Sequence, residues 1–424
     1  MRPYLLIVLL CFLHLVTQAQ KPQLLVYGND ALAFSAAVQG ASSGVSTLWI
    51  STGEIQIGQL NTLGIHQVKE NKLLDAGIWA TFLEEISGKS KLSDSALNQV
   101  KLHLNGQLVK NAVQRMADSL QNLTHLSNVQ ISDIQRKGQK WNVQFSNHRN
   151  VKLQAIVDAS EEGELLKYLE DSVKTTDDKT IIPAGNAYNN TLYRTSLFTF
   201  DEQEKIYLAP FISNIQAVGD NFYSTYNLPG PVKASVPAQM LAGQAIGAAA
   251  AYGAFYKTSS DNINIRRLQG ELLAFGGALL PLQDISRNDP HYIALQRIAA
   301  TGLFKGQLLS DSGAKKIGFF PDSLVTLEDI KPTLLDLYTR SQIWFQGKTV
   351  DTLSLSELMD LIKFTALKGD EIDRELERGW SRTFHFKGNY APEMPVNRRQ
   401  TAVIIDYFLD PFKVNINKEG QFLH

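Results

Sequence analysis

The order of apolar, small and charged segments along this 424-residue sequence predicts an α/β fold with a mainly helical C-terminal region. Three observations support this prediction: a strand-helix-strand pattern begins at Gln23, a helix of small residues spans about Val236 to Tyr256, and charged amphipathic segments follow Asn262. The composition, 44% hydrophobic and 20% charged, is typical of a globular protein with a buried core. We expect an α/β domain over residues 20–262 and a helical region over 263–424.

Residues 1–19 have the pattern of a secretory signal peptide. Arg2 precedes an apolar run over 4–16, and Thr17 and Ala19 are small residues three and one positions before a possible cleavage site. This run is shorter than the about 20 residues that a membrane-spanning helix needs. We therefore expect a periplasmic or extracellular protein with no membrane span after cleavage, and an uncleaved anchor is the alternative.

Several kinds of chemistry find no support in the sequence. Cys11, the only cysteine, would leave with the signal peptide, so the mature chain would have no disulfide and no cysteine nucleophile. The net charge of −1 gives no basic field for nucleic acid. The remaining histidines have no metal-ligand spacing, and no Gly-x-Ser-x-Gly turn is present. We expect no metal site, no nucleic-acid partner and no serine hydrolase.

The α/β part opens with a strand, a turn and a helix. The apolar stretch 23–27 predicts a strand that turns at Gly28 into a helix of small residues. The stretch "VSTLWIS" (45–51) predicts a second strand. Together these segments form a β-α-β unit of about thirty residues.

A mainly helical insertion is expected next, near residues 66–125, because apolar residues recur there at spacings of three and four. The alternating residues around Lys137-Gly138-Gln139 predict a hairpin, and "VKLQAIVDAS" (151–160) predicts a strand. The segment "NFYSTY" (221–226) predicts a further strand, before the helix of small residues. Tight packing against a sheet is the explanation that we favour for this helix, and close approach to a flat ligand is the alternative.

The C-terminal region contains five amphipathic helical patterns. They cover residues 265–275, 292–306, 327–345, 355–367 and 398–412. The sequence shows no repeat that predicts a solenoid. The stretch "HYIALQRIAATGLFKG" resembles one S-layer-homology-type unit, which would suggest envelope attachment, but we favour a helical cap on the α/β part.

The first turn has part of a dinucleotide-binding pattern. Such a turn uses glycine at three places, which hold Gly28, Asp30 and Ala33 in this chain. Asp30 adds a negative charge where a diphosphate would lie at the helix N-terminus. At ~4 Å and an effective dielectric constant of ~20, that charge would cost about 4 kcal/mol, and less if Asp30 points away as a helix cap. Alone, this stretch also fits a plain β-α-β unit.

Four segments in order resemble the FAD-dependent oxidoreductase family. They are "VYGNDALAFSAAVQGASSGVSTLWIS", "IGQLNTLGI", "VDASEEGELL" and "ASVPAQMLAGQAIGAAAA", spread over residues 26–251. The resemblance implies a Rossmann-like FAD/NAD(P)-binding domain and FAD as the cofactor. It also implies transfer of a hydride or an electron pair between flavin and a small substrate that the sequence does not identify. It assigns no catalytic acid or base.

The same resemblance implies cofactor-binding residues. The residues of the pyrophosphate turn would be Gly28, Asn29, Asp30 and Ala33. Those facing the adenosine ribose would be Ser51 and Thr52, and those near the flavin ring Gly58, Gln59 and Leu60. The strand end at the cofactor crossing would consist of Asp158, Ala159 and Ser160. Gly243, Gln244 and the helix they begin would present N–H groups to the pyrimidine edge of the flavin.

Departures from the family pattern leave other interpretations open. Asp30 and Glu161 each replace a glycine, and Ser51 stands where an acid usually holds the ribose. A non-catalytic binding or envelope protein that keeps the fold and has lost FAD is therefore the alternative, and a polysaccharide-active enzyme is a third. Glu161, Glu162 and Glu164 form a carboxylate cluster, which we interpret as a solvated turn.

Overall fold

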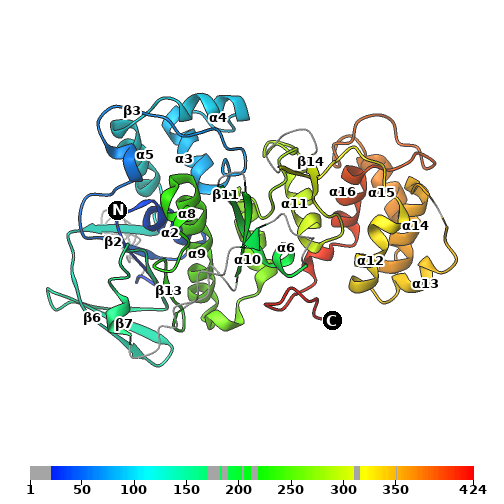
Figure 1. Cartoon of the computed structure of the whole chain (residues 1–424). Helices are drawn as coiled ribbons and strands as arrows, with labels where there is room; N and C mark the ends of the chain where they lie inside the picture. Colours follow the sequence, from blue (N-terminus) through cyan, green and yellow to red (C-terminus); the bar gives the residue numbers. More distant parts are fainter. Residues whose placement is uncertain are drawn as a thin grey trace, which may run out of the picture.

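The computed structural model describes residues 21–169, 182–183, 190–202, 205–211, 218–309, 316–349 and 351–424. The predicted signal peptide, including Cys11, lies outside these residues. The parallel sheet and its helices form one side of the molecule, and the C-terminal helices lie on the other (Figure 1). Within the described ranges, no helix has the length and apolar character needed to cross a membrane.

A five-stranded parallel sheet forms the centre of the α/β part. Its strands, in chain order, are β1 (Leu24–Tyr27), β2 (Thr47–Ser51), β5 (Leu123–Ser127), β9 (Ala155–Asp158) and β13 (Phe222–Ser224). Their order across the sheet is β13-β9-β1-β2-β5. This is the Rossmann order, and the predicted fold class is confirmed. The order reverses between β1 and β9, where sheets of this kind bind ligands at the carboxyl ends of the strands.

The two faces of the sheet have different covers. Because side chains alternate along a strand, Val26 and Trp49 pack with α2 (Ala31–Ser42) and α9 (Val236–Tyr256). Leu25 and Ile50 point the other way, into a second hydrophobic cluster. That cluster includes side chains of an antiparallel sheet made by β6 (Ile131–Lys137), β7 (Lys140–Phe145) and β8 (Asn150–Leu153). The predicted hairpin is confirmed, because Lys137 pairs with Lys140.

The small residues of α9 bring it very close to α2. A Cβ atom on Gly243 would lie 2.4 Å from the Leu32 carbonyl oxygen, and one on Gly247 would lie 2.5 Å from that of Ala36. Real side chains do not tolerate such distances, so both positions require glycine. Close helix packing therefore accounts for the small-residue pattern, and the predicted bounds of this helix are confirmed.

The expected insertion near residues 66–125 is mainly helical. It contains α3 (Gly77–Ser87), α4 (Asp94–Lys101) and α5 (Gly106–Asp118), with the short strands β3 (Ile65–His66) and β4 (Leu104–Asn105) and the 3₁₀ turn η1 (Gly58–Asn61) just before it. The buried Lys101 ammonium donates to Asp75 at 2.6 Å. Asp75 also accepts from the Trp79 indole at 3.3 Å. Asp75 therefore has two donors, and its buried ion pair with Lys101 fixes α4 beside the start of α3.

The segment between β9 and β13 contains elements that the sequence did not predict. These are the turn η2 (Leu166–Tyr168), the helix α6 (Asn190–Thr195) and an antiparallel sheet of β10 (Ile182–Pro183), β11 (Ser196–Glu202) and β12 (Lys205–Pro210). The helix α8 (Gly230–Ala234) then precedes α9. Buried Phe198 and Phe200 of β11 belong to the same core as α9.

The C-terminal region is mainly helical, as predicted. Its helices are α10 (Ile265–Ala274), α11 (Tyr292–Thr301), α12 (Leu327–Leu337), α13 (Ser341–Phe345), α14 (Leu355–Ala366), α15 (Glu371–Gly379) and α16 (Arg398–Phe408), with η3 (Ser260–Asn262) before them and η4 (Pro411–Lys413) after. A two-stranded sheet joins β14 (Gln307–Leu309) to β15 (Lys316–Gly318). The helix predicted over 327–345 is divided because Tyr338 is extended, with φ −137°. Helix α15 was not predicted.

Three of these helices share one N-terminal arrangement. Helices α12, α14 and α16 each begin with a capping box, at Thr326, Ser354 and Asn397. The residues just before these caps form a ring of main-chain hydrogen bonds. Val325 donates to Val396 at 3.1 Å, Val396 donates to Leu353 at 2.9 Å, and Leu353 donates to Val325 at 2.8 Å. The starts of these three helices are therefore arranged around one ring of main-chain hydrogen bonds. The amino-acid sequence did not predict this threefold arrangement.

Candidate cofactor site

The turn after β1 closes against the end of β9. The Ala159 N–H donates to the Tyr27 carbonyl at 2.7 Å, and the Gly28 N–H donates to Ile50 at 3.0 Å. Gly28 has φ +144°, and a Cβ atom there would lie 2.7 Å from the Ala159 oxygen. Only glycine fits this conformation and this contact. The structure therefore brings Gly28 and Ala159 together at the switch point of the sheet.

Asp30 caps α2. Its Oδ1 accepts from the Ala33 N–H at 2.8 Å, and the residue has the extended backbone of an N-cap, with φ −104° and ψ −174°. The carboxylate also faces the Leu32 N–H. Burial raises the pKa of Asp30 to about 6, and the negative charge of Glu161 raises it further. The hydrogen bonds from these amides act in the opposite direction and lower the pKa. The amides at the start of α2 thus already have an anionic partner.

Asp158 and Ser160 organise the loop that follows β9. Asp158 is fully buried, and its Oδ1 accepts from the Ser160 N–H at 3.1 Å and hydroxyl at 2.5 Å. Its Oδ2 accepts from the Leu165 N–H at 2.9 Å, while the Ser160 hydroxyl accepts from the Glu164 N–H at 2.7 Å. Burial raises the pKa of Asp158. The side chains of Asp158 and Ser160 therefore stabilise the loop by hydrogen bonds. The loop in turn places Ala159 beside Gly28.

Tyr27 and Glu164 form a contact at this edge that sequence reasoning missed. The Tyr27 hydroxyl donates to Glu164 Oε2 at 2.7 Å. Burial is the main cause that raises the pKa of Tyr27, and the Glu164 carboxylate is the second cause. Glu161 and Glu162 are exposed in a turn, in agreement with the solvated interpretation of the cluster. In the part of the chain that is described, no group of histidine, cysteine, aspartate and glutamate residues is arranged to hold a metal ion.

Ser51 and Thr52 follow the second strand, where a ribose was expected. Ser51 is fully buried, and its hydroxyl lies 3.0 Å from Nε2 of His125, whereas Thr52 is exposed. The His125 ring also lies against Trp49, with 4.4 Å between ring centroids. Burial lowers the pKa of His125. The structure therefore directs the Ser51 hydroxyl to His125, a partner that only the pairing of β2 with β5 reveals.

The predicted loop at Gly58, Gln59 and Leu60 reaches the same region. Gly58 has φ +53°, and a Cβ atom there would meet Cγ2 of Val236 at 2.7 Å. Leu60 is buried, whereas Gln59 is exposed. The η1 turn thus lies beside the first residue of α9, and the four segments quoted in the sequence analysis converge at the carboxyl edge of the sheet.

The expectation that Gly243 and Gln244 begin a helix is wrong. Helix α9 begins at Val236, so their N–H groups lie inside the helix and are not available to a ligand. Gly243 is packed against α2. Gln244 Oε1 accepts from the Ile78 N–H at 3.1 Å, and its Nε2 donates to Gln39 Oε1 at 3.0 Å. Both residues therefore hold α9 to its neighbours.

The main chain of this site fits a dinucleotide diphosphate, but one side chain competes with it. The glycine turn, the start of α2 and the switch point provide the required backbone. The Asp30 carboxylate faces the Leu32 and Ala33 amides that a diphosphate would use. Glu161 adds a second negative charge nearby. A bound diphosphate would therefore have to displace the Asp30 side chain or meet it protonated.

Parts of this chain are similar to known proteins. Bacillithiol disulfide reductase Bdr from Staphylococcus aureus is 11% identical over 38% of this chain and 43% of its own, with a TM-score of 0.24. Thioredoxin reductase from T. acidophilum is 15% identical over 32% and 34%, with a TM-score of 0.22. The chain spans less than half the length of these solved proteins. No curated protein matches it. Residues 23–186 match the family model of FAD dependent oxidoreductases, and this match supports FAD as the cofactor.

Proposed function

We propose that this protein is an FAD-dependent oxidoreductase that acts on a small substrate outside the cytoplasm. The observation that carries the proposal is the contact of Gly28 with Ala159 at the switch point of a Rossmann sheet, inside the segment that matches the family. When bound, FAD supplies the hydride or electron-pair transfer. The chain supplies the binding site at the start of α2, the η1 turn and the loop after β9.

A second candidate is a non-catalytic protein that keeps this fold and has lost FAD. The Asp30 cap favours it, because the carboxylate already neutralises the positive end of α2. The nearby Glu161 charge favours it too. The two candidates differ in one measurable property, the affinity of the mature chain for FAD.

A titration of the purified mature chain with FAD separates them. We expect saturable binding with a flavin absorption band near about 450 nm in the retained fraction. The Asp30→Gly variant should bind FAD at least about tenfold more tightly, because it removes a charge and glycine is an acceptable N-cap. Asp118→Gly, a change on the exposed surface of α5, is the control and should leave the affinity unchanged. No retention of FAD by either the wild type or Asp30→Gly would support the second candidate.

Export is part of the proposal and has its own test. The pattern of residues 1–19 supports cleavage by a signal peptidase, and the lack of paired arginines implies translocation of the unfolded chain. FAD would then be bound after translocation. We expect the mature N-terminus, determined by mass spectrometry of the secreted or periplasmic fraction, to lie near Gln20. A cytoplasmic protein that retains Met1 would overturn this part of the proposal.

A further inference from the structure

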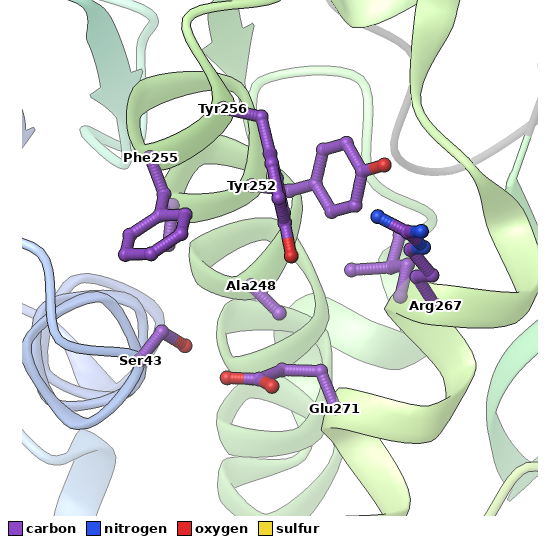
Figure 2. A pocket seen from close by; sticks show the side chains of 9 residues that line it. Ser43, Ala248, Tyr252, Phe255, Tyr256, Arg267 and Glu271 are labelled. Atoms are coloured by element: carbon purple, nitrogen blue, oxygen red, sulfur yellow. The ribbon is translucent and has the colours of Figure 1, made fainter.

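A cavity of about 180 Å³ lies between α2, α9 and α10, near the C-terminal ends of α2 and α9. Figure 2 shows three aromatic rings at one end of it and the Glu271 carboxylate and Ser43 hydroxyl at the other, with Ala248 between them. Asp30 begins α2, whereas Ser43 follows its last residue. Because α2 has 12 residues, about 18 Å of helix separates this cavity from the cofactor site.

The rings belong to the last turns of α9 and remain open to solvent. Phe255 and Tyr256 are 58% and 50% exposed, and Tyr252 is half-buried. The centroids of Tyr252 and Tyr256 are 4.5 Å apart, and those of Phe255 and Tyr256 are 5.1 Å apart. Two exposed rings and one half-buried ring form an apolar patch beside a cavity, which is typical of a binding surface.

Two opposite charges on α10 line the same cavity. Arg267 and Glu271 are four residues apart, and neither forms an ion pair with another described residue. The Arg267 guanidinium lies over the Tyr256 ring at 5.8 Å. The stability of α10 does not explain these charges, because a cation in the first turn and an anion in the last turn oppose the helix dipole. The order arginine before glutamate is also the less favourable one for a pair of this spacing.

We propose that this cavity is a binding site for one sugar ring of a saccharide. The rings offer negative faces to the C–H groups of a pyranose. The guanidinium offers several N–H donors, the carboxylate offers acceptors, and both are suited to neighbouring hydroxyl groups. The hydroxyls of Tyr252 and Tyr256 add further polar contacts, whereas that of Ser43 already accepts from Gln39.

Size and charge select this class of ligand. A cavity of about 150 Å³ accommodates one benzene-sized ring, so the observed volume suits a single substituted six-membered ring. The charges of Arg267 and Glu271 cancel, so the cavity has no net attraction for an anion or a cation. A neutral ring with many hydroxyl groups satisfies both charged side chains and the aromatic patch together.

Ligand-observed NMR and calorimetry on the mature chain test this proposal. The probes are methyl glucopyranoside, methyl galactopyranoside and methyl mannopyranoside, with tetramethylammonium as a charged probe of the aromatic patch. We expect at least one glycoside to bind saturably with a Kd on the order of 1 mM, as for a ligand of a dozen heavy atoms. Binding of tetramethylammonium alone, or of no probe at about 10 mM, would overturn the proposal.

Variants connect the binding to this cavity. Tyr256→Ala and Glu271→Gln should each weaken glycoside binding at least about tenfold, and Arg267→Lys should weaken it as well because the planar donor pair is lost. Tyr407→Ala is the matched control, since Tyr407 is 51% exposed on α16. FAD affinity should not change in any of these variants. Glycoside binding that survives both Tyr256→Ala and Glu271→Gln would show that the site is elsewhere.

Discussion

At the scale of single residues, Asp30 decides how the candidate site behaves. Its carboxylate caps α2, and burial raises its pKa to about 6 from an ordinary value near 3.8. The folded chain therefore binds a proton at Asp30 more tightly than the unfolded chain does. Stability from this group is present below pH 4 and is lost as the pH rises through about 6.

The Asp30→Asn variant isolates this effect, because asparagine is an equally good N-cap without a charge. Between about pH 4 and pH 7, the free energy of unfolding should fall by roughly 1–3 kcal/mol more in the wild type than in the variant. Urea denaturation at several pH values measures the difference. FAD binding should also weaken with rising pH in the wild type and lose that dependence in the variant. Parallel pH profiles for both proteins would contradict this role of Asp30.

Gly28 allows the turn after β1 to pack closely against Ala159. Gly28→Ala places a methyl group 2.7 Å from the Ala159 oxygen at a φ of +144°, so the turn must shift. Strained backbone and overpacking each cost on the order of 1–3 kcal/mol, and we expect a loss of stability in that range together with weaker FAD binding. Gly53→Ala is the control in the neighbouring turn, where the nearest atom is 3.9 Å away. Thermal unfolding should distinguish the two variants clearly.

The amino-acid sequence predicts site residues that depend on local patterns, but it does not predict those that depend on contacts between distant segments. Gly28 and the end of β9 follow from local patterns, because a turn and a strand end are encoded by neighbouring residues. The contact between Ser51 and His125 depends on β2 pairing with β5, which no local pattern specifies. The small-residue pattern predicts a helix from Val236, as observed, whereas the resemblance made Gly243 and Gln244 a helix start, which the structure contradicts.

At the scale of elements, periodic helices were predicted best. Helix α10 was recognised because its amphipathic pattern extends over several turns, whereas α9 was recognised from a long run of small residues. The strands β11 and β12 were missed because β11 packs against α9, which is distant in sequence, and β12 pairs with β11. The amphipathic α15 was missed because glutamate and arginine dominate it, and only Ile372 and Leu376 are buried apolar side chains.

The α2 and α9 pair offers a test of helix packing. Gly247→Ala should destabilise the protein by roughly 1–3 kcal/mol, because the new methyl group would lie 2.5 Å from the Ala36 oxygen. Gly270→Ala, in the middle of α10, should instead stabilise it by about 0.5–1 kcal/mol, since its nearest neighbour is 4.0 Å away and alanine favours helices. Chemical denaturation of both variants measures whether the free energy of unfolding falls in the first variant and rises in the second. Equal effects would show that α2 and α9 separate easily.

At the scale of the whole molecule, one core joins the sheet to the C-terminal helices. Buried residues from Leu24 in β1 to Phe412 in η4 belong to a single hydrophobic cluster. A buried amide connects the same parts, because Gln269 Nε2 donates to the Ser196 carbonyl at 2.9 Å. Within the C-terminal region, buried Gln296 both donates to and accepts from the Leu280 main chain at 3.0 and 2.9 Å. The division at residues 262 and 263 stays a prediction, but the packing indicates that the two regions stabilise each other.

A continuous core predicts one cooperative unfolding transition. Trp49, Trp79 and Trp141 report on the α/β part and Trp344 and Trp380 on the C-terminal helices, so fluorescence of single-tryptophan variants can follow each region. Both regions should lose structure at the same denaturant concentration. Gln296→Leu leaves the buried Leu280 N–H without its partner at a cost of about 1–3 kcal/mol, while the Leu280 carbonyl keeps the Leu282 N–H, and the change should lower both transitions together. A shift confined to the C-terminal tryptophans would instead mean that the helical region unfolds by itself and that the shared core contributes little coupling.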